Sequence, residues 1–223
     1  MTYYPIIVIL ILAILEWIAA DKKWKILEYV AKPLTMVALL WWMWLNVGLG
    51  GSMLWFTLGA VFCLAGDVFL MIPQDMFIFG LLAFLVGQVC YVVGLNNLPP
   101  YINLFGIILI IVLGIYVWWL YPRLTRGLET KGKSKLKIPV LVYALVISIM
   151  VYSALMTWTR SGWPALASLS VSLGAVLFYA SDSILAWDRF VKPLIHGRLK
   201  NMVTYHLGQI GIILGAILHL TLK

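Results

Sequence analysis

The sequence predicts an all-α fold, a polytopic membrane bundle of about eight transmembrane helices. Of the 223 residues, 64% are apolar and only 11% are charged, whereas a globular protein keeps about 25% charged residues because its surface faces water. The mean hydropathy is +1.03. The apolar residues also gather in runs long enough for the roughly 20 residues that one helical span needs. These runs leave no room for a soluble domain, so we expect a single integral membrane domain over residues 1–223.

Charged, Pro and Gly residues divide the chain into the expected spans. The breaks are, in chain order, the lysines at 22–25, the glycines at 48–51, the turn at 73–75, the prolines at 99–100, the basic stretch 123–137, Arg160 to Gly162, and the basic stretch 189–200. The first run has no Lys or Arg ahead of it, so it reads as a retained span rather than a secretory signal. The expected spans cover about residues 4–20, 32–47, 52–72, 76–95, 101–121, 137–158, 163–187 and 201–221.

Basic residues indicate the orientation. Fourteen of the 16 Lys and Arg residues follow the first, fifth and seventh spans, and only Arg160 and Lys223 fall on the other side. By the positive-inside rule, the basic connections are cytoplasmic and both termini are non-cytoplasmic, in a bacterial cytoplasmic membrane or an endoplasmic-reticulum membrane. We read the net charge of +8 as a topology signal and a contact for anionic lipids, and we expect no nucleic-acid partner.

The two halves of the chain resemble one another. Residues 57–67 align without a gap on residues 172–182, and Gly87-Gln88 matches Gly208-Gln209. We therefore expect a parallel four-plus-four repeat with halves of about residues 1–100 and 101–223, related by an axis along the membrane normal. Asp67 and Asp182 would then be symmetry mates at equal depth, near the interface between the halves.

Polar residues within the spans form the candidate site. Asp67, Asp182, Glu16 and His206 each lie five to seven residues from the cytoplasmic end of their span, which is roughly 8–10 Å at 1.5 Å per residue. An ionised carboxylate there costs at least about 2.5–3.5 kcal/mol, so we expect at least one aspartate to keep its proton. We assign function to the two aspartates, and a supporting, hydrogen-bonding role to Glu16 and His206.

Metal and cofactor chemistry has little support in the sequence. The three His residues, at positions 196, 206 and 219, lack the short spacing of a metal site. No phosphate-binding loop, dinucleotide fingerprint or nucleophile elbow is present. Cys63 and Cys90 lie in apolar runs and imply no disulfide framework. We expect no metal and no cofactor, so any chemistry belongs to carboxyl groups.

Five short segments carry a family resemblance. They are Lys32-Pro33-Leu34-Thr35, Gly66-Asp67-Val68-Phe69-Leu70, residues 80–91, Ser181-Asp182-Ser183-Ile184-Leu185-Ala186 and Thr204-Tyr205-His206-Leu207-Gly208-Gln209. In this order they resemble the YhhN family of integral membrane proteins, which includes lysoplasmalogenases. The resemblance implies two essential aspartates, one in each half, at the positions of Asp67 and Asp182. Gln88 departs from the family, many of whose members carry His there, so we give it no catalytic role.

The resemblance implies hydrolysis of a vinyl ether. A lysoplasmalogenase converts lysoplasmenylethanolamine or lysoplasmenylcholine into a fatty aldehyde and glycerophosphoethanolamine or glycerophosphocholine. Acid chemistry suits this bond, because protonation of its β-carbon forms an oxocarbenium ion that water then attacks. Two buried carboxyl groups, one protonated and one ionised, can supply the acid and the base. The sequence leaves open which aspartate is the acid.

The remaining polar residues are candidates for substrate binding. Lys32, at the cytoplasmic start of the second span, is placed to pair with the lipid phosphate. Four more side chains are assigned hydrogen bonds to glycerol or water: Gln88, Tyr91, Tyr205 and Gln209. Ser181 is assigned a supporting role. The expected partner is a lysophospholipid within the membrane, and no obligatory protein partner is implied.

Two other functions fit parts of the pattern. A transporter for a lipid or small solute could use a proton-titrating aspartate pair, since repeats with intramembrane carboxylates also occur in proton-coupled carriers. An intramembrane aspartyl protease is disfavoured, because Leu64 breaks its Gly-x-Gly-Asp signature. A family member with a lost or altered activity would have the same sequence features as an active one.

Overall fold

The computed structural model describes residues 2–72, 74, 76–96 and 103–222. Within these residues, eight helices are long and apolar enough to cross a membrane, which confirms the predicted all-α, multi-pass membrane fold. The helices are α1 (Tyr4–Lys22), α2 (Lys25–Val47), α3 (Leu54–Met71), α4 (Phe77–Leu95), α5 (Leu104–Thr130), α6 (Lys137–Leu155), α7 (Ala165–Ala186) and α8 (Gly197–Thr221).

Two helices extend past prolines at which the sequence suggested a boundary. The second span was expected to start at residue 32, but α2 begins at Lys25 and carries Pro33 in its interior. Likewise, α5 continues through Pro122 to Thr130. Proline removes a backbone donor, yet membrane helices tolerate it where neighbouring groups bond the freed backbone. The expected start of the second span is therefore wrong, and Lys32 lies two turns inside α2.

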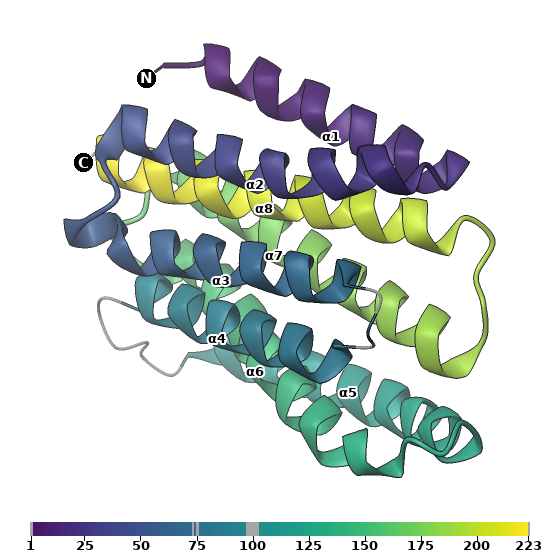
Figure 1. Cartoon of the computed structure of the whole chain (residues 1–223). Helices are drawn as coiled ribbons and strands as arrows, with labels where there is room; N and C mark the ends of the chain where they lie inside the picture. The colour runs from purple at the N-terminus through teal and green to yellow at the C-terminus, as the bar shows by residue number, and fades with distance from the viewer. Residues whose placement is uncertain (1, 73, 75, 97–102, 223) are drawn as a thin grey trace.

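The chain alternates between two ends of the bundle. Figure 1 shows the start of α1 and the end of α8 at one end, and the connections α1–α2, α5–α6 and α7–α8 at the other. We call this second end the basic end, because these three connections and the adjoining helix ends carry most of the Lys and Arg residues. The positions 73, 75, 99, 100 and 223, which divide or orient the chain, lie outside the described residues, as does residue 101, the expected start of the fifth span. The arrangement puts the expected basic connections on one side.

Glycines bring the helices of two hairpins into close contact. A Cβ on Gly174 of α7 would lie 2.4 Å from the backbone nitrogen of Ile212 on α8, and a Cβ on Gly66 of α3 would lie 2.6 Å from the ring of Phe84 on α4. Small residues allow such approach in membranes, where packing drives helix association. These are the hairpins that the proposed duplication relates, and the duplication itself stays a prediction.

Helix α8 lies at the centre of the bundle and α5 at its edge. Helix α8 contacts α1, α2, α3 and α7, whereas α5 packs against α6 and the π-helical turn Trp187–Val191 that extends α7. The main core surrounds α8 and includes Trp42, Phe56 and Phe178. A smaller apolar cluster fixes the basic end of α5. Elements from across the chain therefore meet around α8.

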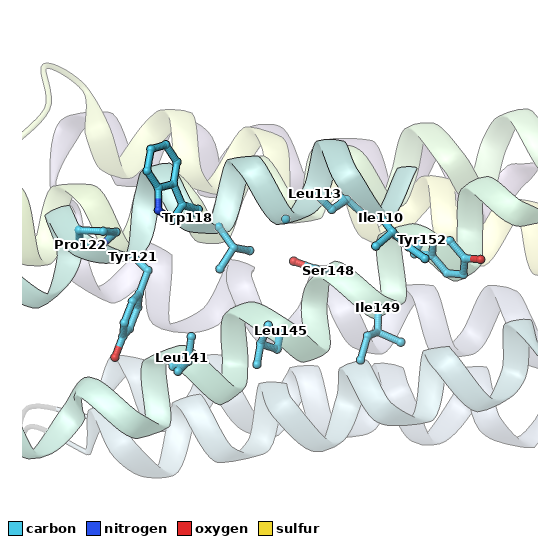
Figure 2. A pocket seen from close by; sticks show the side chains of 12 residues that line it. Ile110, Leu113, Trp118, Tyr121, Pro122, Leu141, Leu145, Ser148, Ile149 and Tyr152 are labelled. Carbon is cyan, nitrogen blue, oxygen red and sulfur yellow. The ribbon is translucent and has the colours of Figure 1, made fainter. Parts of the chain in front are cut away.

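A wide apolar groove of about 790 Å³ runs between α5 and α6. Figure 2 shows Leu113 and Trp118 of α5 and Leu145 and Ile149 of α6 around this groove. Trp118 is 76% exposed and Ile149 51%, so the groove belongs to the lipid-facing surface. None of the candidate site residues lines it.

Candidate active site

Asp67 of α3 is the centre of a buried polar cluster. Its Oδ1 lies 3.0 Å from the Nζ of Lys32 on α2, and its Oδ2 accepts a 2.7 Å hydrogen bond from the hydroxyl of Tyr205 on α8. The two charged side chains are only 1% and 5% exposed. A charge inside a bilayer is costly unless an opposite charge accompanies it, so each of these two side chains lowers the cost of burying the other. Lys32, expected at the membrane interface, is instead an interior residue.

Asp182 of α7 has different surroundings. Its Oδ2 accepts a hydrogen bond from the hydroxyl of Tyr143 on α6, and the two side chains line a small cavity of about 50 Å³. Among the described residues, no Lys, Arg or His lies within 4.0 Å of this carboxylate. Asp67 and Asp182 interact electrostatically. The pair is thus asymmetric, because only one of its members has a cation.

Glu16 and His206 form a neighbouring layer between α1 and α8. Trp17 Nε1 donates a 3.1 Å hydrogen bond to His206 Nδ1, and Glu16 Oε2 lies 3.9 Å from the same nitrogen. Because Nδ1 accepts from the indole, we assign the ring proton to Nε2 and treat His206 as neutral. The contact with Glu16 is then not an ion pair. Tyr205 connects this layer to Asp67, because its ring lies next to that of His206 and its hydroxyl donates to the Asp67 carboxylate.

A group of buried amides lies one turn farther from the basic end. The Tyr91 hydroxyl donates a 2.7 Å hydrogen bond to Gln209 Oε1, and Gln88 lies beside Tyr143. Within the described part of the chain, both amide atoms of Gln88 and the Nε2 of Gln209 have no hydrogen-bond partner. Buried polar groups normally have one, so these donors and acceptors are available to water or to a polar group of a substrate.

Ser181 is the candidate that the structure does not bring into this cluster. Its hydroxyl donates to the backbone carbonyl of Asn201 at 2.9 Å, and Asn201 Nδ2 donates to Ser181 Oγ at 2.8 Å. Both residues are buried between α7 and α8. The side chain therefore joins two helices.

The sequence did not reveal Tyr143 or the ion pair between Arg198 and Glu28. Tyr143 lies six residues after Lys137, so the depth criterion that selected His206 could have found it. Glu28 and Arg198 fell outside the expected spans, because α2 and α8 both begin earlier than their composition suggested.

A second cavity, of about 230 Å³, lies at the basic end next to the carboxyl groups. We call it the mouth cavity. It shares Leu70 and Leu185 with the small cavity at Asp182, and Lys32 reaches from its wall to Asp67. The mouth cavity is lined by Lys32, Leu70, Leu185, Asp188, Arg189, Gly197, Arg198, Asn201 and Met202. A polar space thus adjoins both aspartates.

Comparisons with known proteins agree on one family. The model of the YhhN family matches residues 27–216. The lysoplasmalogenase TMEM86B of Rattus norvegicus is 33% identical over 96% of this chain and 82% of its own length, and that of Mus musculus is 33% identical over 98% and 88%. A lysoplasmalogenase of Mycobacterium bovis is 32% identical over 64% of this chain and 52% of its own length. No solved structure matches the chain. With its eight membrane-spanning helices and a family match over most of its length, the chain belongs to the YhhN family.

Proposed function

We propose that this chain is a lysoplasmalogenase, which hydrolyses the vinyl ether of a one-chain alkenyl phospholipid within the membrane. The products are a fatty aldehyde and glycerophosphoethanolamine or glycerophosphocholine. The observation that carries the proposal is the pair of unlike carboxyl groups, Asp67 beside Lys32 and Asp182 beside Tyr143. The family and the names of the relatives support it.

Asp182 is the proton donor in this proposal. The reaction needs an acid that still holds its proton when the lipid arrives. Asp182 can hold one, because no cation among the described residues competes for its carboxyl group. After the proton leaves, the Tyr143 hydroxyl donates to the new carboxylate and stabilises its charge.

The steps balance with one water molecule. Asp182 gives its proton to the β-carbon of the vinyl ether, whose double-bond electron pair forms the new C–H bond and leaves an oxocarbenium ion. The oxygen of a water molecule then attacks the α-carbon, and a proton of that water returns to Asp182. The hemiacetal collapses when its C–O bond to glycerol breaks, with its hydroxyl proton passing to the glycerol oxygen. Asp182 ends the cycle as it began.

Asp67 stabilises the positive charge. Its ion pair with Lys32 is neutral in the free enzyme, but an ammonium has three N–H donors and can bond a lipid phosphate as well. Lys32, Asp67 and the phosphate together then carry a net charge of −1, which stabilises an oxocarbenium ion in a site that excludes bulk water. The open amide groups of Gln88 and Gln209 are placed to hold the attacking water.

The depth of the site suits this substrate. Asp67 lies four residues before α3 ends at Met71, or about 6 Å along the helix axis. In a phospholipid the vinyl ether adjoins the glycerol, just beneath the headgroup layer. We place the basic end in the cytoplasm and both termini outside, by the positive-inside rule, in a bacterial cytoplasmic or endoplasmic-reticulum membrane. The lipid could then react without leaving the bilayer.

The test is aldehyde release by the purified protein from a one-chain alkenyl phospholipid, with the alkyl-ether analogue as the substrate control. We expect release from the alkenyl lipid alone, and its loss in Asp182→Asn, which keeps the shape of the side chain and removes the titratable proton. Asp21→Asn, at a partly exposed carboxylate of the same end that pairs with His196, is the matched control. If folded wild-type protein released no aldehyde, the proposal would fail. Movement of an unaltered lipid or solute across vesicles would then favour a transporter.

A further inference from the structure

We propose that the mouth cavity binds the zwitterionic headgroup of the lipid, with Arg198 and Lys32 at the phosphate and Asp188 at the ammonium group. This inference rests on the proposed lysoplasmalogenase function and names the residues that select the headgroup. Asp188 is the specificity-determining residue in it.

The volume of the mouth cavity fits one part of a lipid. Its 230 Å³ is below the roughly 300–1,000 Å³ of sites that enclose a whole small molecule. It adjoins the cavity at Asp182 through Leu70 and Leu185. The glycerol backbone joins the vinyl ether to the phosphate through a few bonds. A lipid that presents its vinyl ether to Asp182 therefore has its phosphate near the mouth cavity.

Arg198 is held at this cavity by a buried partner. Its guanidinium is ion-paired with Glu28, and the two side chains are 56% and 3% exposed. Guanidinium has five N–H donors in a planar fork, so a carboxylate on one side leaves donors for a phosphate on another. The buried carboxylate orients the arginine, whose side chain also lines the mouth cavity. Lys32 completes the phosphate site from the inner wall.

Asp188 gives the cavity a position for a cation. Of the nine described residues that line the mouth cavity, Asp188 alone is acidic. Its Oδ1 accepts a 2.6 Å hydrogen bond from the backbone nitrogen of Leu194, which fixes the side chain. Gly197 leaves room for this carboxylate, because a Cβ there would lie 2.4 Å from Oδ1 and would displace it. A carboxylate has about four lone-pair sites, so Asp188 can also accept from an ammonium group.

The three basic side chains of the lining, those of Lys32, Arg189 and Arg198, would suit any phosphate. An inorganic phosphate or a lipid phosphate without an amine would meet the same cations, but it would also meet the negative charge of Asp188. Repulsion by a like charge excludes wrong ligands. The cavity therefore favours a phosphate that carries an amine.

The first test compares two substrates. Asp188→Asn keeps an oxygen acceptor for the Leu194 amide and removes the charge. We expect the ratio of kcat/KM for alkenyl lysophosphoethanolamine to kcat/KM for alkenyl glycerophosphate, which lacks the amine, to fall about tenfold. This corresponds to about 1.4 kcal/mol. In Asp21→Asn the ratio should keep its wild-type value. An unchanged ratio in an active Asp188→Asn enzyme would overturn the headgroup assignment and leave the hydrolase proposal standing.

Arg198 is tested by a variant that keeps its charge. Arg198→Gln would leave Glu28 buried without a cation and could unfold, so Arg198→Lys is the second variant. We expect Arg198→Lys to raise KM for alkenyl lysophosphoethanolamine about tenfold, and to affect alkenylglycerol, which has no phosphate, much less. Arg126→Lys, at an exposed arginine of α5, is the control. Equal effects on the two lipids would contradict the phosphate assignment.

A binding measurement separates this inference from the proposed activity. Soluble phosphoethanolamine and inorganic phosphate are titrated calorimetrically into the full-length protein in a neutral detergent. We expect phosphoethanolamine to bind more tightly, with the difference lost in Asp188→Asn. If the protein released no aldehyde yet showed this preference, the hydrolase proposal would fail and the cavity assignment would hold. Absence of the preference would overturn the assignment, whatever the activity.

Discussion

Removal of the Lys32 ammonium should expose how strongly the protein depends on the Asp67 ion pair. Lys32→Met keeps much of the length of the side chain but leaves Asp67 without a cation, in a place where it is 1% exposed. At the observed 3.0 Å, two unit charges attract by about 5.5 kcal/mol with an effective dielectric constant of about 20. Desolvation of each ion costs several kcal/mol, so the intact pair contributes little net stability.

Removal of only one partner should lower stability strongly, because the other charge then stays buried without a counter-ion. Breaking a buried ion pair on one side costs about 3–5 kcal/mol. We expect a loss of this size in the free energy of unfolding for Lys32→Met, and a similar loss for Asp67→Asn. In the double variant Lys32→Met/Asp67→Asn neither charge remains, and the amide oxygen of the substituted side chain can still accept from Tyr205. We expect its stability within about 1 kcal/mol of wild type.

The assay is a denaturant titration of the purified protein in detergent, followed by tryptophan fluorescence. The four proteins form a double-mutant cycle, whose coupling energy should be at least about 5 kcal/mol. Lys135→Met, at an exposed lysine of the basic end, should change stability by less than about 0.5 kcal/mol. If the two single losses simply added in the double variant, the ion pair would not be what stabilises these residues, and the charge assignment of the site would be refuted.

Three further substitutions test the site and the packing. Tyr143→Phe should lower turnover about ten- to a hundredfold, because a hydrogen bond to a charged acceptor contributes about 1.5–3 kcal/mol, and it should lower stability by only about 1 kcal/mol. Tyr121→Phe, in the lipid-facing groove, should leave turnover unchanged. Equal steady-state rates for Tyr143→Phe and wild type would argue against the proposed acid. Gly174→Ala should lower the free energy of unfolding by about 1–3 kcal/mol through overpacking, because the new Cβ would lie 2.4 Å from the backbone of α8. Gly114→Ala is the control. Its Cβ would have no atom within 4 Å, so the same titration should show no loss of stability. Lys23 has a φ of 58° as the C-cap of α1, so Lys23→Gly should raise stability by about 1 kcal/mol; a loss would mean that the lysine side chain matters more than the backbone conformation.

The sequence was most informative where the bilayer imposes a simple rule. A span needs about 20 apolar residues and internally satisfied backbone groups, so composition alone predicted eight helices. The cost of burying polar groups likewise selected Asp67, Asp182, Glu16 and His206, because such residues are rare inside a membrane. These arguments need no knowledge of which helices are neighbours.

The partners of these residues could not be predicted in the same way. Lys32 was placed at the interface because Pro33 and the nearby lysines suggested a helix start, but α2 continues through the proline. The Arg198 and Glu28 pair joins residues 170 positions apart, and such contacts depend on helix neighbours and on rotation about the helix axis. Tyr143 was hidden among eleven tyrosines, most of which suit membrane interfaces. Pairing across helices therefore had to come from the structure.

The glycine contacts between α7 and α8 also limit how the protein can move. Backbones that touch along Gly174 and Gly208 cannot slide past one another without separating, so Asp182 and Tyr205 move together as parts of one rigid unit. Helix α5 is less constrained in the half farther from the basic end, where most of its side chains face lipid. Amide hydrogen exchange should accordingly be slow through α7 and α8 and faster in α5. Entry of a lipid tail from the bilayer would then be accommodated by displacement of α5, while the distance between Asp182 and Tyr205 stays constant.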